Sequence, residues 1–282
     1  MPHTERLEPV DYLVIGHLTV DDTPAGPRLG GSAAYAALTA QALGLRAGIL
    51  TAWGEELPLD ALDGVAVANI GAEQSTRFQN NYADGARTQF ILQQAPFIEF
   101  HHIPEAWRSA PMLHLAPVAR EVSPRIVKYF EDATIAATPQ GWLRDWDADG
   151  RVHPTDWPEA EHVLARLDAC VLGLEDVGGD VQRVEAMAAF CPALVLTAGK
   201  AGATLYARGA ETHIPAPSVN EVDPTGAGDV FAATFLVQLH RGGETLLAAQ
   251  LAAQIAAHSV TRPGLAGIPT RDELFDLLAE AA

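Results

Sequence analysis

Short apolar runs alternate with segments of helical spacing along most of this chain. DYLVIG (11–16) is an apolar run that ends in glycine, the profile of a buried strand. GGSAAYAALTAQALG (30–44) has helical spacing, and RAGILTAWG (46–54) is typical of a second strand. The rhythm returns in the runs MLHLAP, VSPRIVKYFED, TIAAT, DACVLGL, VQRVEAMAAF and ALVLTAG. This succession predicts an α/β fold with a parallel sheet and crossover helices.

Two segments depart from this rhythm. STRFQNNYADGARTQFILQQA (75–95) alternates around the turn ADGA, which predicts a small antiparallel flap projecting from the main sheet. From residue 226 onward the spacing is helical, and helices are expected over 226–241, about 243–260 and 270–280. A length of 282 residues suits one large α/β domain with an appendage.

The charge balance limits the classes of binding partner that are expected. The chain has 36 acidic and 18 basic residues, and its net charge of -18 would repel nucleic acid and anionic membranes, so neither is expected as a partner. Cys170 and Cys191 lie in apolar surroundings and are expected in the core of a protein from a reducing compartment. MPHTERLEP has no apolar signal core, and the apolar stretches are too short to span a bilayer. A cytoplasmic protein is therefore expected.

The stretch NEVDPTGAGDVFAATF (220–235) joins a turn to a helix. Gly226 and Gly228 at the helix start let a ligand approach the backbone, where free N–H groups and the helix dipole favour a phosphate. Asp229 in the first turn is placed to accept a proton from a hydroxyl that attacks phosphorus. From these residues alone, Asp229 is equally interpretable as a charge that complements the helix dipole.

The wider context resembles one enzyme family. DPTGAGD (223–229) is similar to the D-T-x-G-A-G-D signature of the ribokinase-like PfkB family of carbohydrate kinases, with Pro224 as a departure inside the turn. RLGGSAAYAALTAQALG (28–44) resembles the glycine pair and Ala-rich helix of the family, and DYLVIGHLTVDD (11–22) resembles its opening strand. LVLTAGKAGATLY (194–206) is similar to its nucleotide-contacting turn T-x-G-x-x-G, and SVTRPGLAGIPTRDEL to its C-terminal close. The matches run in family order over nearly the whole chain.

This resemblance implies a ribokinase-like (Rossmann-like) three-layer α/β sandwich, with a mainly parallel central sheet, in a single domain over 1–282. It also implies a small β lid at about 17–29 and 75–95, through which a homodimer is expected to form. The activity that it implies is an ATP-dependent phosphotransfer, with Mg2+ bridging the phosphates. A monovalent cation such as K+ is expected near Asp223 and Thr225.

The resemblance also assigns roles to individual residues. Asp229 would be the catalytic base, and the amides of Gly226, Ala227 and Gly228 would form the hole for the transferring phosphoryl group. The residues carried over to the acceptor side are Asp21, Gly30, Gly31 and, at a substituted position, Tyr35. Those carried over to the nucleotide side are Thr197, Gly199, Gly202 and Thr225.

Two departures bear on substrate and metal. Tyr35 stands where the family usually has an asparagine that binds sugar hydroxyls, and a phenol there fills more space and offers an aromatic face. The N-x-x-E element of the family aligns with a stretch from Gly173, so its asparagine is absent. Glu175 or Asp176 is then expected to reach Mg2+ through water, although both also suit a first helical turn.

Other polar residues lie at the expected ligand edge of the sheet. Arg120 follows the strand MLHLAP, where the carboxyl ends of parallel strands open to ligands, and it is a candidate for substrate binding. Arg144, between Trp142 and Trp146, is a similar candidate for a phosphate or hydroxyls. For both arginines a structural surface role is the simpler interpretation.

These observations predict a kinase that transfers the γ-phosphoryl group of ATP to a hydroxyl of a small sugar or polyol. A nucleoside kinase is an alternative, because Tyr35 offers a ring for stacking on a base. A sugar-binding regulator with weakened catalysis is another, motivated by the departures at Tyr35 and Gly173. A dinucleotide dehydrogenase is disfavoured, since VIGHLTVDD lacks the G-x-G-x-x-G pattern.

Overall fold

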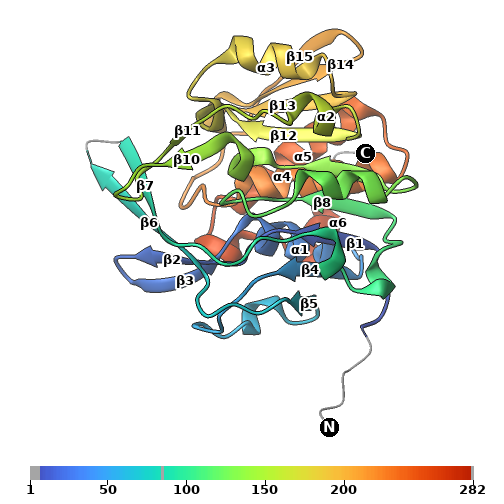
Figure 1. Cartoon of the computed structure of the whole chain (residues 1–282). Coiled ribbons are helices and arrows are strands. Elements are labelled where there is room, and N and C mark those ends of the chain that lie inside the picture. The colour runs from blue at the N-terminus through green and yellow to red at the C-terminus, as the bar shows by residue number, and fades with distance from the viewer. Residues whose placement is uncertain (1–6, 84–85, 281–282) are drawn as a thin grey trace.

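The apolar runs form a central sheet. The computed structural model describes residues 7–83 and 86–280, and nine strands of this part lie in the order β15-β14-β13-β12-β9-β8-β1-β4-β5 (Figure 1). They are β1 (Tyr12–Ile15), β4 (Ala47–Thr51), β5 (Ala66–Asn69), β8 (Met112–Leu115), β9 (Thr134–Ala137), β12 (Ala169–Gly173), β13 (Ala193–Thr197), β14 (Ala203–Ala207) and β15 (Ala210–Ile214). The strands from β5 to β13 pair in parallel, and β14 is antiparallel to both of its neighbours. The predicted α/β class with a mainly parallel sheet is confirmed.

Alternation along each strand decides what covers each face of the sheet. In β1, Tyr12 and Val14 belong to one apolar cluster, and Leu13 and Ile15 belong to another. The first cluster is completed by the helices α1 (Ser32–Ala42), α4 (Ala227–His240), α5 (Thr245–Ser259) and α6 (Arg271–Glu280). The second is completed by α2 (Ala160–Leu164), α3 (Val181–Ala188) and several 3-10 turns. Figure 1 shows the resulting three layers, with the sheet in the middle.

The connections include eight 3-10 helices within the described part of the chain. They are η1 (Asp60–Leu62), η2 (Phe100–His102), η3 (Glu105–Trp107), η4 (Pro124–Tyr129), η5 (Pro139–Leu143), η6 (Leu174–Val177), η7 (Gly199–Ala201) and η8 (Gly264–Gly267). The segment VSPRIVKYFED, expected as a crossover helix, contains only η4. Pro124 begins this turn without a backbone donor.

A second, smaller sheet projects from one end of the first. Its order is β3-β2-β6-β7, with the strands β2 (Thr19–Thr23), β3 (Gly26–Gly30), β6 (Thr76–Ala83) and β7 (Ala86–Gln93). The expected antiparallel pairing within 75–95 is present as β6 and β7 (Figure 1). We call these four strands the lid. The hairpin β10 (Arg144–Trp146) and β11 (Val152–Pro154) lies against it through a bridge between Phe90 and Arg151.

The two cysteines are buried as expected, Cys170 in β12 and Cys191 after α3. Among the described residues, the helices all lack either the length or the apolar character that crossing a bilayer would demand.

Candidate active site

The candidate residues gather where the parallel strands end. Gly16 and His17 follow β1, Val118 follows β8, and Asp176 follows β12. In parallel sheets this carboxyl edge is where ligands bind. The starts of α1 and α4 meet at the same edge, because Ser32 of α1 hydrogen-bonds through its side chain to Asp229 of α4.

Asp229 is a half-buried carboxylic acid in the first turn of α4. Burial raises its pKa to about 7, and the hydrogen bond from Ser32 opposes this shift. The charge of Asp176 raises the pKa further, while the charge of Arg144 lowers it. A carboxylate whose pKa lies near neutrality is matched to proton transfer at physiological pH.

The helix start beside Asp229 leaves room for a ligand. Gly226 adopts a left-handed conformation with a φ of 80°, and α4 has no side-chain N-cap. A Cβ added to Gly228 would meet nothing within 4 Å, so open space lies before it. The amide of Ala227 makes a long hydrogen bond of 3.2 Å to the carbonyl of Pro224. The oxygens of a phosphoryl group placed there would accept bonds from the first amides of the helix.

Tyr35 packs against the start of α4 and offers little surface to a ligand. The residue is only 4% exposed. Its ring lies directly on Gly226, because a Cβ added there would come within 2.1 Å of the Tyr35 Cδ1 atom. Burial, followed by the charges of Asp223, Asp21 and Asp229, raises the pKa of the phenol. Tyr35 therefore closes the gap between α1 and α4.

Asp21 stands on the face of the lid that looks toward this region. Thr19 donates a hydrogen bond of 2.9 Å to its Oδ1 atom. Gly30 gives it space, since a Cβ at that position would lie 2.3 Å from the Asp21 Oδ2 atom. Gly31 has a φ of 95°, and a Cβ there would come within 2.4 Å of the His17 carbonyl oxygen. The two glycines thus allow β3 to turn into α1 close to β2.

Asp223 anchors the turn that precedes α4. Its Oδ1 accepts a 3.0 Å bond from the Thr225 amide, and its Oδ2 accepts a 3.0 Å bond from the Gly264 amide. Burial opposes ionisation, but these bonds and Arg28, with a nitrogen at 3.7 Å, leave the pKa of Asp223 below its ordinary value. Protein donors thus engage both oxygens, and the monovalent cation near Asp223 and Thr225 stays a prediction.

Asp176 follows β12 with both carboxylate oxygens engaged. Its Oδ2 accepts a 2.8 Å bond from the Gly173 amide, and its Oδ1 accepts a 3.1 Å bond from Gln140. Glu175 is exposed beside it. Among the described residues there is no group of three or more His, Cys, Asp or Glu side chains placed to hold a metal. That Glu175 or Asp176 reaches Mg2+ through water stays a prediction.

Of the residues expected on the nucleotide side, Thr197, Gly199 and Gly202 lie around the end of β13. Thr225 lies instead in the turn before α4. Thr197 donates to the carbonyl of Leu172 at 3.3 Å. Gly199 and Gly202 frame η7 with φ values of 53° and 90°. A Cβ at Gly202 would come within 2.2 Å of the Ile214 carbonyl, so the turn needs glycine there. These residues form a tight turn at the same carboxyl edge of the sheet as Asp229.

Arg120 and Arg144 differ from each other in the structure. Arg120 has a φ of 60° and a half-exposed guanidinium 3.0 Å from Asp145 on β10. Arg144 is buried, so the surface interpretation was wrong for it. Arg144 is among the groups that act on the pKa of Asp229, and Arg120 is not.

Sequence reasoning missed two residues of this region besides the role of Arg144. One is Ser32, whose hydrogen bond to Asp229 joins two helices. The other is Glu121, a fully buried carboxylate that accepts bonds from the amides of His17, Val118 and Ala119. Glu121 thereby ties the end of β1 to the end of β8. Tertiary contacts bury Glu121, and the sequence alone does not show them. Its place after the strand MLHLAP, next to Arg120, was a signal that could have made it a candidate too.

Comparisons with known proteins support the resemblance to a family of carbohydrate kinases. The sequence profile of the pfkB family carbohydrate kinases matches residues 159–271. The ribokinase of Bacillus subtilis is 41% identical over 96 residues, which are 34% of this chain and 33% of that protein. A fructokinase of Escherichia coli is 27% identical over 303 residues, covering 93% of this chain and 97% of that protein. The chain thus matches about a third of the length of the first relative and nearly all of the second.

A solved structure agrees in fold. The sulfate complex of a pyrophosphate-dependent kinase in the ribokinase family superposes with a TM-score of 0.80 at 20% identity, covering 94% of this chain and 99% of that one. At this identity the likeness shows the fold alone. Together with the motifs, these matches confirm the resemblance to the ribokinase-like PfkB family of carbohydrate kinases.

Proposed function

We propose that this protein is an ATP-dependent kinase that phosphorylates a hydroxyl group of a small sugar or polyol. The observation that carries the proposal is Asp229, with a pKa of about 7, beside the open start of α4. A base and an anion site within one helical turn are the two parts that phosphoryl transfer to an alcohol requires.

The proposed reaction assigns one task to each part of the site. The carboxylate of Asp229 accepts the proton of the attacking hydroxyl, whose oxygen forms a bond to the γ-phosphorus. The bond between that phosphorus and the departing diphosphate breaks, and the first amides of α4, at Gly226, Ala227 and Gly228, stabilise the charge in transit. Mg2+ supplies further charge neutralisation on the donor phosphates.

The remaining candidates divide into an acceptor side and a donor side. Asp21, Gly30 and Gly31 shape the acceptor side beneath the lid, and the lid excludes water from the hydroxyl being phosphorylated. The donor side is shaped by the turns that contain Thr197, Gly199, Gly202 and Thr225. A homodimer through the lid stays a prediction, for which the edge strand β3 offers unpaired backbone groups.

A specific observation favours a sugar or polyol over a nucleoside. Tyr35 was the aromatic candidate for stacking on a base, but its ring is nearly fully buried against Gly226. The lid face beside it carries the polar residues Asp21 and Arg28, which pair across β2 and β3. Polar groups of this kind suit several hydroxyls of one small ring.

The test is a phosphorylation panel with the purified chain. ATP and pyrophosphate are offered as donors, the latter because the fold neighbour is pyrophosphate-dependent. Ribose, hexoses, inositols, ketose acids and nucleosides are offered as acceptors. We expect transfer from ATP to a sugar or polyol, with kcat roughly 10²–10⁴-fold lower in Asp229→Asn. Asp272→Asn, at an exposed position on α6, serves as the matched control.

Four outcomes contradict the proposal. Undiminished turnover in Asp229→Asn would remove the base assignment. Transfer only to nucleosides would replace the acceptor class, and transfer only from pyrophosphate would replace the donor. Calorimetric binding of a sugar without transfer from either donor would support the regulator instead.

A further inference from the structure

Arg144 is a buried cation that links the lid to the central sheet. It opens β10, and its side chain is only 11% exposed. A guanidinium at this depth is retained only where acceptors and charges compensate its lost hydration. Its surroundings therefore indicate what it holds in place.

The contacts of Arg144 come from separate parts of the fold. Its Nη1 atom donates at 3.0 Å to the side-chain oxygen of Gln89 on β7 and at 3.3 Å to the carbonyl of Val118 after β8. Its Nη2 atom lies 3.9 Å from Asp176 after β12. Its guanidinium carbon lies 5.9 Å from the centre of the Phe78 ring on β6. One side chain thus touches both lid strands of the hairpin and two strand ends of the main sheet.

The contact with Gln89 continues along the lid. Gln89 donates from its amide nitrogen to the side-chain oxygen of Asn80 at 3.0 Å. Asn80 pairs with Gln89, and Phe78, two residues before Asn80, pairs with Asp21. Since side chains two residues apart share a face, the series Arg144, Gln89 and Asn80 ends on the face that carries Asp21. That face also meets the loop after β8, where Phe78 packs with Val118.

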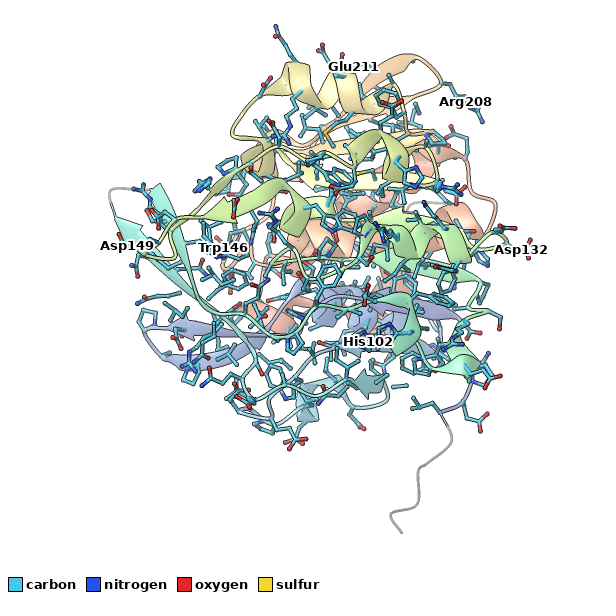
Figure 2. All side chains as sticks on the ribbon, viewed as in Figure 1. His102, Asp132, Trp146, Asp149, Arg208 and Glu211 are labelled. Carbon is cyan, nitrogen blue, oxygen red and sulfur yellow. The ribbon has the colours of Figure 1, made fainter. Side chains whose placement is uncertain are left out.

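The hairpin that holds Arg144 is itself fixed to the lid. The Ile91 amide donates to the Gly150 carbonyl at 2.9 Å, and Phe90 is bridged to Arg151. Figure 2 shows Trp146 and Asp149 of this hairpin region beside the lid strands. Main-chain bonds hold this hairpin region to Phe90 and Ile91 of β7. Arg144 adds a side-chain connection from Gln89 of β7 to the residues after β8 and β12.

We propose that Arg144 is a positioning residue that sets the lid over the acceptor site, acting through Gln89 and Asn80. The inference rests on the proposed function, because it concerns how the acceptor hydroxyl is brought within reach of Asp229. It distinguishes Arg144 from a residue that binds the donor phosphates: on the lid its guanidinium contacts the amide of Gln89 and the ring of Phe78, and the acceptor would feel their displacement first.

A double-mutant cycle tests this assignment. Arg144→Met keeps the length of the side chain and removes its donors, and Gln89→Met removes the acceptor on the lid. We expect Arg144→Met to raise the acceptor KM about 10- to 100-fold with the donor KM unchanged, since small misplacements are costly in such sites. Gln89→Met should raise it less, and the double variant should be no worse than Arg144→Met alone.

A second readout is the hydrolysis of the donor, because the lid is expected to keep water away from it. Donor hydrolysis relative to transfer should rise in Arg144→Met and Gln89→Met, because a displaced lid admits water. Arg151→Met, an exposed residue of the same hairpin region, is the matched control and should change neither quantity. Arg144→Lys keeps the charge and should fall between the wild type and Arg144→Met.

The outcomes separate this proposal from the proposed function. Wild-type turnover decides whether the chain is a kinase, and if it fails, the cycle is run on the Kd for a bound sugar measured by calorimetry. Additive effects of the two substitutions, or a rise in donor KM alone, would overturn the role of Arg144. If Arg144→Met does not fold, Gln89→Met decides alone, and an unchanged acceptor KM in that folded variant would also overturn it.

Discussion

The helices α1 and α4 begin alike and are held differently. Each follows a glycine of positive φ, Gly31 at 95° and Gly226 at 80°, and neither has a side-chain N-cap. The neighbour of Gly31 is the carbonyl of His17, whereas the neighbour of Gly226 is the ring of Tyr35. The main chain therefore fixes the start of α1, and a replaceable side chain fixes the start of α4, which carries the proposed base Asp229.

Gly31→Ala is expected to have the largest effect on stability. Its Cβ would lie 2.4 Å from the His17 carbonyl at a φ of 95°, so the backbone of β2 or α1 would have to move. We expect a loss above roughly 3 kcal/mol, or no folded protein, by urea denaturation. Gly44→Ala is the control, since Gly44 has a φ of 88° with nothing within 4 Å. Equal losses in the two variants would contradict the packing argument.

Gly226→Ala should cost less than Gly31→Ala, and its cost should depend on Tyr35. In the background of Tyr35→Ala the added Cβ no longer meets a ring, and only the backbone cost remains. We expect a coupling of roughly 1–3 kcal/mol between the two substitutions in a double-mutant cycle of unfolding free energies. An additive pair would mean that Tyr35 does not hold the start of α4.

Asp229, the ionisable residue at the start of α4, should lower the free energy of unfolding when it is ionised. The pKa of Asp229 is about 7 in the folded chain against 3.8 in the unfolded one, so its ionised form is disfavoured on folding. The cost is absent at low pH, grows as pH rises above 3.8, and levels off above pH 7. Asp229→Asn should therefore raise stability by on the order of 2 kcal/mol at pH 8 and hardly at pH 4, as measured by thermal unfolding. A gain that did not depend on pH would contradict the assignment.

The smallest expected effect concerns Ser32. Its hydrogen bond lowers the pKa of Asp229, so Ser32→Ala should raise that pKa further above 7. The acidic limb of the kcat/KM profile should then move to higher pH, by roughly a unit or less. Ser259→Ala, at a buried serine of α5, should leave the profile in place. A limb that moved to lower pH in Ser32→Ala would reverse the sign of the proposed interaction.

The sequence predicted what depends on neighbours along the chain. The start of α4 at the glycines, the pairing of β6 with β7 and the buried strands follow from local patterns of turns and apolar residues. The contact of Ser32 with Asp229 and the burial of Arg144 depend on elements far apart in the sequence. The spacing of residues in the sequence could not indicate this contact or this burial, because the sequence pattern would be the same if these residues lay at the surface.

Tyr35 illustrates the same limit at a position that the sequence did single out. Its identity correctly drew attention, but whether its ring faces a ligand or a helix depends on how closely α1 and α4 approach. The two helices contact each other, and both carry small buried residues, such as Ala34 and Ala233. Only the packing of the folded chain decides whether the Tyr35 ring is part of a binding surface or is covered by α4.

The division of the site along the chain has an evolutionary consequence. The lid strands, proposed to face the acceptor, all lie before residue 94, whereas the proposed base and the turns proposed for the nucleotide lie after residue 196. The family profile matches 159–271, the stretch without the lid. If the proposed function holds, the first half of such a chain would be free to diverge toward new acceptors while the second half kept the residues of phosphoryl transfer.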